Sequence, residues 1–366
     1  MESKDSNKKA EENFEIKIQK MIDTFTKAEK LGKENSKKFQ DWIKEISNPN
    51  FHLITNLLNY FLDDLTSTNM RENIFKIMRK LYHLNRETVA PQIKANKDFA
   101  KSIVVHINNG DKSKISDNCF YLLTQLFNYK TYKSEIDEAF ILALFEGLSI
   151  VREEDILNDI VGILIEINYE YAPEEENLFI KIHKDNENSR VLNEILLRVL
   201  NNEHEDSKKI KILKCLDDLM STYTNSIFYE SDLESFIDIL LPKLQMTDNN
   251  DLKKKLLECL DDLMSNYTNS IFYESDLESF IDILLPKLQM TENDDLKEKL
   301  LKCLERVTKY DEYYRQMYKV EEITELMEDF ESAENQSEKV RNIGKLIVTN
   351  ITDRQGKNKK NLDEEK

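Results

Sequence analysis

A tandem repeat constrains the fold of this chain more than any other feature. Residues 211–254 and residues 255–298 differ at only six positions, so the period is 44 residues. The sequence KLLKCLERV, from Lys299, begins the same unit a third time and then diverges. A period of this length is typical of solenoids that are built from pairs of helices.

Each unit divides into two segments with helical periodicity. Apolar residues recur three or four positions apart in both segments, which predicts two amphipathic helices. The stripe of the first helix includes Leu213, Leu216 and Leu219, and that of the second includes Leu233, Phe236 and Leu240. Neither helix can bury its stripe alone, so successive units must stack. We therefore predict an all-α fold, an armadillo/HEAT-like α-solenoid of stacked helix pairs.

Local signals predict where the second helix begins and how it ends. Ser231 and Glu234 form an S-x-x-E pattern, which predicts a capping box at the helix N-terminus. Pro242 follows inside the helix, where it removes one backbone hydrogen bond and is expected to kink the helix or end it early. The second copy repeats these signals at Ser275, Glu278 and Pro286.

Composition supports a helical protein and argues against several function classes. Only 6 Gly and 5 Pro occur, too few for the many tight turns of a sheet protein. The net charge of −18 opposes binding to nucleic acid. No apolar run is long enough for a membrane helix, and the N-terminus resembles no signal peptide, so we expect a cytoplasmic protein without membrane insertion.

The expected domain organisation is simple. Residues 1–12 and residues 351–366 are highly charged and are predicted to be disordered. Residues 13–350 are predicted to form a single solenoid, because no segment between them has the composition of a linker.

No pattern of catalytic or metal-binding residues stands out. The chain has no H-E-x-x-H, no C-x-x-C and no glycine-rich phosphate loop. Three cysteines recur at one repeat position and are interpreted as core residues: Cys215, Cys259 and Cys303. The carboxylate pairs Asp217-Asp218 and Asp261-Asp262 are interpreted as a solvated helix face. We therefore expect no enzyme activity, no cofactor and no metal.

A motif between the two helices of each unit is the candidate functional site. It occurs twice, as Phe228, Tyr229 and Asp232 and again as Phe272, Tyr273 and Asp276. In one interpretation the aromatic residues staple the turn and the aspartate occupies the first helical turn, where the helix dipole favours an anion. In the other, the aromatic residues are exposed contacts for a protein partner.

The order of several segments resembles the leucine-rich domain of the WISH/DIP/SPIN-ninety family, in the short fungal Dip-type form. The similarity covers roughly residues 155–330. The segments that carry it are IEINYEY (165–171), LLRVLNNEHE (196–205), IFYESDLESFIDILLPKL (227–244) and LKEKLLKCLERVTKYDEYY (296–314). The family has a single F-Y-x-x-D-L unit, whereas this chain has two.

The resemblance implies a function in the actin cytoskeleton. It implies an armadillo-like domain that binds the Arp2/3 complex, and possibly actin, and activates the complex to nucleate linear filaments without a mother filament. It also implies a role in endocytosis at cortical actin patches. The alternative is a generic armadillo-repeat scaffold or adaptor that binds a basic peptide or a kinase, and the negative charge suits basic cargo.

Overall fold

The computed structural model describes residues 2–34, 36–63, 66–127, 136–170, 177–222, 228–267, 271–333 and 336–364. Within these ranges the regular elements are α-helices with two short 3-10 helices, and no strand occurs. The predicted all-α class is therefore confirmed. Contacts divide the chain into two compact units, Met1–Val191 and Leu192–Lys366, called unit 1 and unit 2 below.

Unit 1 is built from two rows of helices. Its elements are α1 (Glu2–Lys30), α2 (Lys37–Ser47), η1 (Pro49–Phe51), α3 (Leu53–Leu62), α4 (Thr68–Leu84), α5 (Arg86–Lys94), α6 (Lys97–Asn109), η2 (Lys112–Lys114), α7 (Asp117–Leu126), α9 (Glu138–Ile150), α10 (Glu154–Glu170) and α11 (Leu178–Asp185). One row packs in the order α1, α4, α7 and α10, and the other in the order α3, α6, α9 and α11. This side-by-side packing is consistent with an α-solenoid.

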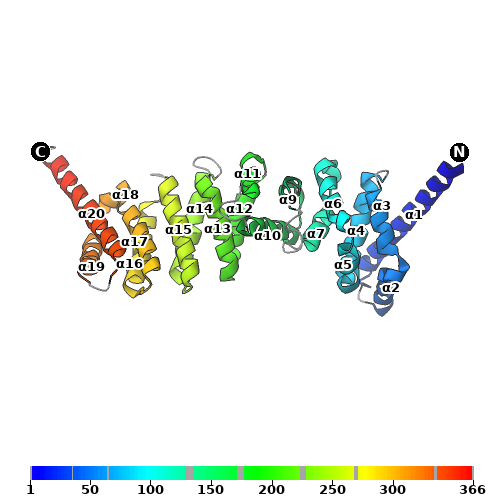
Figure 1. The fold of residues 1–366 in the computed structure, drawn as a ribbon, viewed down its shortest axis with the longest axis horizontal. Coiled ribbons are helices and arrows are strands. Elements are labelled where there is room, and N and C mark those ends of the chain that lie inside the picture. Colours follow the sequence, from blue (N-terminus) through cyan, green and yellow to red (C-terminus); the bar gives the residue numbers. More distant parts are fainter. Residues whose placement is uncertain are drawn as a thin grey trace. The chain divides into compact units, whose positions relative to one another are not determined.

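Unit 2 contains the duplicated repeats and has the same kind of packing. Its helices are α12 (Ser189–Asn202, which begins at the end of unit 1), α13 (Asp206–Thr222), α14 (Glu230–Met246), α15 (Asn250–Asn266), α16 (Glu274–Met290), α17 (Asp294–Val307), α18 (Asp311–Gln316), α19 (Val320–Ser332) and α20 (Glu338–Glu364). One row runs α13, α15, α17 and α20, and the other runs α14, α16 and α18 (Figure 1).

The apolar stripes that the sequence predicts form the core of unit 2. Leu216, Leu260 and Leu304 occupy the same position in three successive repeats, and all three are fully buried. The second-helix stripe is likewise buried, as Phe236 and Phe280 show. The 44-residue period therefore corresponds to one step of the helix stack.

Of the two outcomes expected for the prolines, a kink or an early end, the early end does not occur. Helix α14 continues past Pro242 to Met246, and α16 continues past Pro286 to Met290. A proline inside a helix removes one backbone hydrogen bond, and its ring crowds the carbonyl group four residues earlier. Here Pro242 lies on the exposed side, while Leu241 and Leu244 are buried on either side of it in the sequence, so core packing holds the last turn.

The terminal helices extend close to both ends of the described chain. Helix α1 begins at Glu2, and α20 extends to Glu364. Residues 2–12 contain neither Gly nor Pro and are rich in Lys and Glu, which have high helix propensity. Both ends continue a helix whose inner part packs in the stack, so their backbone extends a helix that has already formed.

Candidate protein-binding site

The two aromatic residues of the repeated motif differ in solvent exposure. The side chains of Phe228 and Phe272 are buried, with 7% and 4% exposure. Tyr229 and Tyr273, one residue later, are 50% and 58% exposed. Each copy of the motif therefore combines a structural phenylalanine with a tyrosine that lies at the surface.

The buried phenylalanine helps to hold successive repeats together. The ring of Phe272 meets that of Tyr310 edge-on, with centroids 5.7 Å apart. The Tyr310 hydroxyl donates to the carbonyl oxygen of Met264 at 3.2 Å. Burial raises the pKa of Tyr310 to about 12, so this hydroxyl remains a donor at any physiological pH. Phe272 thus anchors the turn between α15 and α16 to the residues that follow α17.

The aspartate of the motif caps the second helix. Tyr229 is the N-cap residue of α14, and its backbone N–H donates to Asp232 Oδ2 at 3.1 Å. The second copy repeats this bond between Tyr273 and Asp276, at 2.9 Å. The carboxylate also lies in the first turn, where the helix dipole favours a negative charge.

The cap predicted at Ser231 and Glu234 is therefore wrong by two positions. The capping bond is made by the aspartate three residues after the tyrosine, because the helix begins at Glu230. Glu234 instead accepts a hydrogen bond from the Tyr273 hydroxyl, with an O–O distance of 2.6 Å. This bond raises the pKa of Tyr273 and connects α14 to the start of α16.

Acidic residues surround the exposed tyrosine of the second copy. Glu234 and Glu230 raise the pKa of Tyr273, and Asp238 and Glu234 raise the pKa of Asp276. Burial is the main cause of the raised pKa of Asp276, and the neighbouring carboxylates add to it. We refer to Tyr229, Tyr273, Glu230, Glu234 and Asp238 as the tyrosine surface. It combines aromatic area with negative charge, and so it suits a partner that offers basic side chains.

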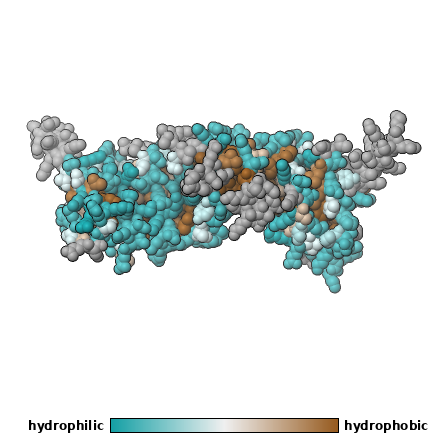
Figure 2. All heavy atoms as spheres, in the orientation of Figure 1, coloured by the Kyte–Doolittle hydropathy of each residue, from teal (hydrophilic) through white to brown (hydrophobic). Residues whose placement is uncertain are grey.

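Other exposed apolar residues of unit 2 are scattered. Met246 and Met290, at the ends of α14 and α16, are exposed at equivalent positions. A hollow of about 500 Å³ lies beside Met290 and is lined in part by Lys253, Lys287 and Asp248. On the face drawn in Figure 2, the described surface of unit 2 is mostly hydrophilic. Isolated apolar residues of this kind are normal on a soluble protein.

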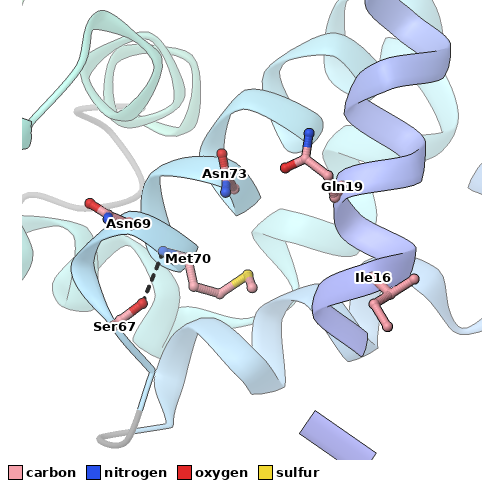
Figure 3. Close-up of a pocket in the computed structure, with 6 residues that line it drawn as sticks. All are labelled: Ile16, Gln19, Ser67, Asn69, Met70 and Asn73. Carbon is pink, nitrogen blue, oxygen red and sulfur yellow. Dashed lines mark hydrogen bonds between the residues drawn. The ribbon is translucent and has the colours of Figure 1, made fainter. Parts of the chain in front are cut away.

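A smaller hollow of about 380 Å³ lies in unit 1 between α1 and α4 (Figure 3). Its lining is mixed, with Ile16 and Gln19 from α1 and Met70 and Asn73 from α4. Ser67 at its edge accepts a hydrogen bond from the backbone N–H of Met70 and so serves as the N-cap of α4. None of the described residues that line this hollow is charged.

The repeated cysteines lie in the helix stack, as the sequence predicts. Cys215, Cys259 and Cys303 are buried and unpaired. The thiols of Cys259 and Cys303 donate to carbonyl oxygens of the preceding row helix, those of Leu213 and Leu257. Burial raises the pKa of all three thiols well above its usual value. These are the properties of inert core thiols.

The interpretation of the paired aspartates as a solvated face is wrong for Asp217. Asp217 on α13 has only 16% of its side chain exposed, and it pairs with Lys255 on α15. Burial, and then the interaction with Asp217, raises the pKa of Asp262 on α15 to about 7. Both carboxyl groups are therefore located at the junction between two row helices.

Neither a metal site nor a membrane-spanning helix occurs within the described ranges. No group of three or more His, Cys, Asp or Glu side chains could hold a metal ion there. Among the same residues, no helix combines the length and hydrophobicity that a bilayer crossing requires.

The fold and the tyrosine surface together indicate a class of protein. A stack of helices that carries an exposed aromatic and acidic surface is typical of a scaffold protein that acts through protein–protein contacts. The family model described as "SPIN90/Ldb17, leucine-rich domain" matches residues 153–269. This match confirms the resemblance to the family over those residues. This family is associated with actin.

The match begins in unit 1 just before α10 and ends three residues after α15, so it includes one whole copy of the motif and stops before Tyr273. No curated protein matches the chain. Among solved structures, a crystal structure of an engineered protein is similar over 82% of this chain and 96% of its own, with 12% identity and a TM-score of 0.26. That similarity is too low to support an argument.

Proposed function

We propose that this chain binds the Arp2/3 complex and activates it, so that linear actin filaments form without a mother filament. The observation that carries the proposal is the leucine-rich domain at residues 153–269. On this proposal the protein acts in the cytoplasm, at cortical actin patches that support endocytosis. It needs no cofactor and catalyses no reaction.

A rigid helix stack can activate a partner only by differential binding. It must bind the active arrangement of the complex more tightly than the inactive one, and the populations then shift by that difference. A shift from about 1% to about 99% active complex requires roughly 5.5 kcal/mol of preference. An interface of standard size can supply this amount.

The tyrosine surface is the proposed contact. Tyr229 and Tyr273 combine apolar area with a hydroxyl, a combination that is enriched at energetically important positions of interfaces. Their backbones are fixed by the Asp232 and Asp276 caps, and the Tyr273 ring is held by Glu234. Such a surface loses little conformational entropy when a partner binds.

The test is an actin assembly assay with purified Arp2/3 complex and actin monomers. We expect the wild-type chain to shorten the lag and to yield unbranched filaments. The double variant Tyr229→Ala, Tyr273→Ala should bind the complex at least tenfold more weakly, whereas Met246→Ala, Met290→Ala serves as the matched control at other exposed positions. If the wild-type chain neither binds the complex nor shortens the lag, the proposal fails.

The duplication allows a second test. Deleting residues 255–298 restores a single motif and keeps the repeat register, because Lys299 then takes the place of Lys255. Since the family has one such unit, we expect this deletion to preserve activation. Loss of activation with intact folding would show that the contact surface extends across both copies.

A basic peptide is the alternative partner, and the acidic composition of the tyrosine surface favours it. In that case the chain would act as an adaptor rather than an activator. Binding of lysine- and arginine-rich peptides that is lost in the double tyrosine variant, together with no effect on actin assembly, would support this function.

A further inference from the structure

The duplication places unlike residues at two equivalent helix junctions. Positions 262 and 306 are one repeat apart, and they hold Asp262 on α15 and Arg306 on α17. At the junction of α15 with α17, Arg306 Nε donates to Asp261 Oδ1 at 3.0 Å. One repeat earlier, the equivalent positions hold Asp262 and Asp217, so a carboxyl group takes the place of the guanidinium opposite the other carboxyl group.

The groups around this pair do not remove the repulsion between the two carboxylates. Lys255 pairs with Asp217 Oδ2 and, at 3.2 Å, with Glu258. The other oxygen, Asp217 Oδ1, is buried, and none of the N–H, ammonium or hydroxyl groups in the described ranges donates to it. A protonated Asp262 can donate to this acceptor, whereas an ionised Asp262 can only repel it.

Charged groups on the neighbouring helices are already paired. On α17, Arg306 pairs with Asp261, and Lys299 pairs with Glu258 at 2.5 Å. On α13, Asp218 pairs with Lys214 at 3.0 Å. Helix α14 also packs against α15, but its acidic residues Glu230, Glu234 and Asp238 belong to the tyrosine surface. Lys255 is thus the cation that faces the pair, and Asp261 adds a further negative charge on α15.

We propose that a proton held between Asp262 and Asp217 stabilises the packing of α13 against α15 in the duplicated repeats. Loss of this proton weakens that packing. The proton replaces the guanidinium of Arg306 in the neighbouring junction. Helix α14 follows α13, and helix α16 follows α15. The packing of α13 against α15 therefore determines how firmly Tyr229 and Tyr273 are held relative to each other.

The direction of the pH effect follows from the environment of Asp262. Burial, and then the contact with Asp217, raises its pKa to about 7, whereas an aspartate in an unfolded chain titrates near about 3.9. The folded protein therefore holds this proton more tightly than the unfolded chain. Its stabilising effect is complete below about pH 4 and is lost as the pH rises through about 7.

The test is thermal unfolding of the full chain at pH 5.5 and pH 8. For the wild type, this titration should lower the Tm by roughly 3–6 °C between the two values, after allowance for partial solvent screening. Asp262→Asn should abolish this drop, and Asp262→Arg should abolish it and raise the Tm at pH 8. Asp248→Asn, which changes an exposed aspartate of the same unit, should retain the wild-type drop.

A second measurement does not depend on unfolding. The side-chain carboxyl carbon of Asp262, followed by NMR in ¹³C-aspartate-labelled protein, should titrate with a midpoint near pH 7. Deleting residues 255–298 brings Arg306 opposite Asp217 and should also abolish the pH-dependent drop. A midpoint near pH 4, or an equal drop for wild type and Asp262→Asn, would overturn the proposal.

Discussion

Leu260→Ala is the sharpest test of how unit 2 is packed. Leu260 lies in α15, which packs against α13 on one side and α17 on the other, and its side chain is fully buried. Truncation removes buried methyl groups and leaves a cavity between three helices. Leu→Ala changes at such sites cost about 2.7–5 kcal/mol, and the upper part applies where the surroundings cannot collapse.

This free energy converts to a large shift in Tm. For a unit the size of unit 2, each 1 kcal/mol lowers the Tm by about 2–4 °C, so we expect a drop of about 5–20 °C. Circular dichroism at 222 nm during heating measures it directly. Leu216→Ala, at the equivalent position one repeat earlier, should fall in the same range because Leu216 is equally buried.

The control is Met290→Ala in the same repeat. Met290 is 83% exposed, so its truncation should change the free energy of unfolding by less than about 0.5 kcal/mol. Leu260→Asp should be more severe than Leu260→Ala and unfold the local stack, because it buries an unpaired charge. If Leu260→Ala melts within about 2 °C of wild type, the packing of α15 between α13 and α17 is refuted.

Three further predictions follow from particular contacts. Asp276→Ala removes the cap of α16 and should cost about 1 kcal/mol, or about 2–4 °C in a thermal melt, and an unchanged melt would argue against the cap. Gly147→Ala should destabilise unit 1 by about 1–3 kcal/mol in urea titration, because the new Cβ would lie 2.7 Å from Ile160 Cδ1; Gly162→Ala, with open space around it, should be neutral or stabilising. The four cysteines should react with a thiol reagent only after denaturation, because burial keeps them protonated, and fast labelling of the native chain would contradict their placement.

The core of unit 2 could be predicted from the sequence because helical periodicity is a local property. Two near-identical copies give the position of each stripe twice, so Leu216 and Leu260 were assigned correctly to the core. The same pattern could not select the helix cap. Ser231 with Glu234 and Asp232 with the Tyr229 N–H are both acceptable local signals. The choice depends on which residue leaves helical geometry first, and in the structure Tyr229 is the N-cap residue.

The candidate site was predicted in part. The sequence located the motif but could not separate its buried phenylalanine from its exposed tyrosine, because the two are adjacent in a turn where no periodicity applies. The structure resolves this through Phe272, whose ring packs on that of Tyr310, two helices further along the chain. The bond between Tyr273 and Glu234 also joins residues 39 positions apart, and no local rule connects them.

The sequence by itself determined the helical class, the 44-residue step and the residues that face the core, since each of these follows from spacing along one chain segment. The tertiary structure alone decided what lies opposite each helix. Asp217 and Asp262 are 45 positions apart, and they meet because α13 and α15 stack with a particular offset. Periodicity fixes the face that a side chain occupies, but the partner on the next helix depends on how the two helices cross. For this reason two aspartates that looked like solvated surface residues meet at a helix junction.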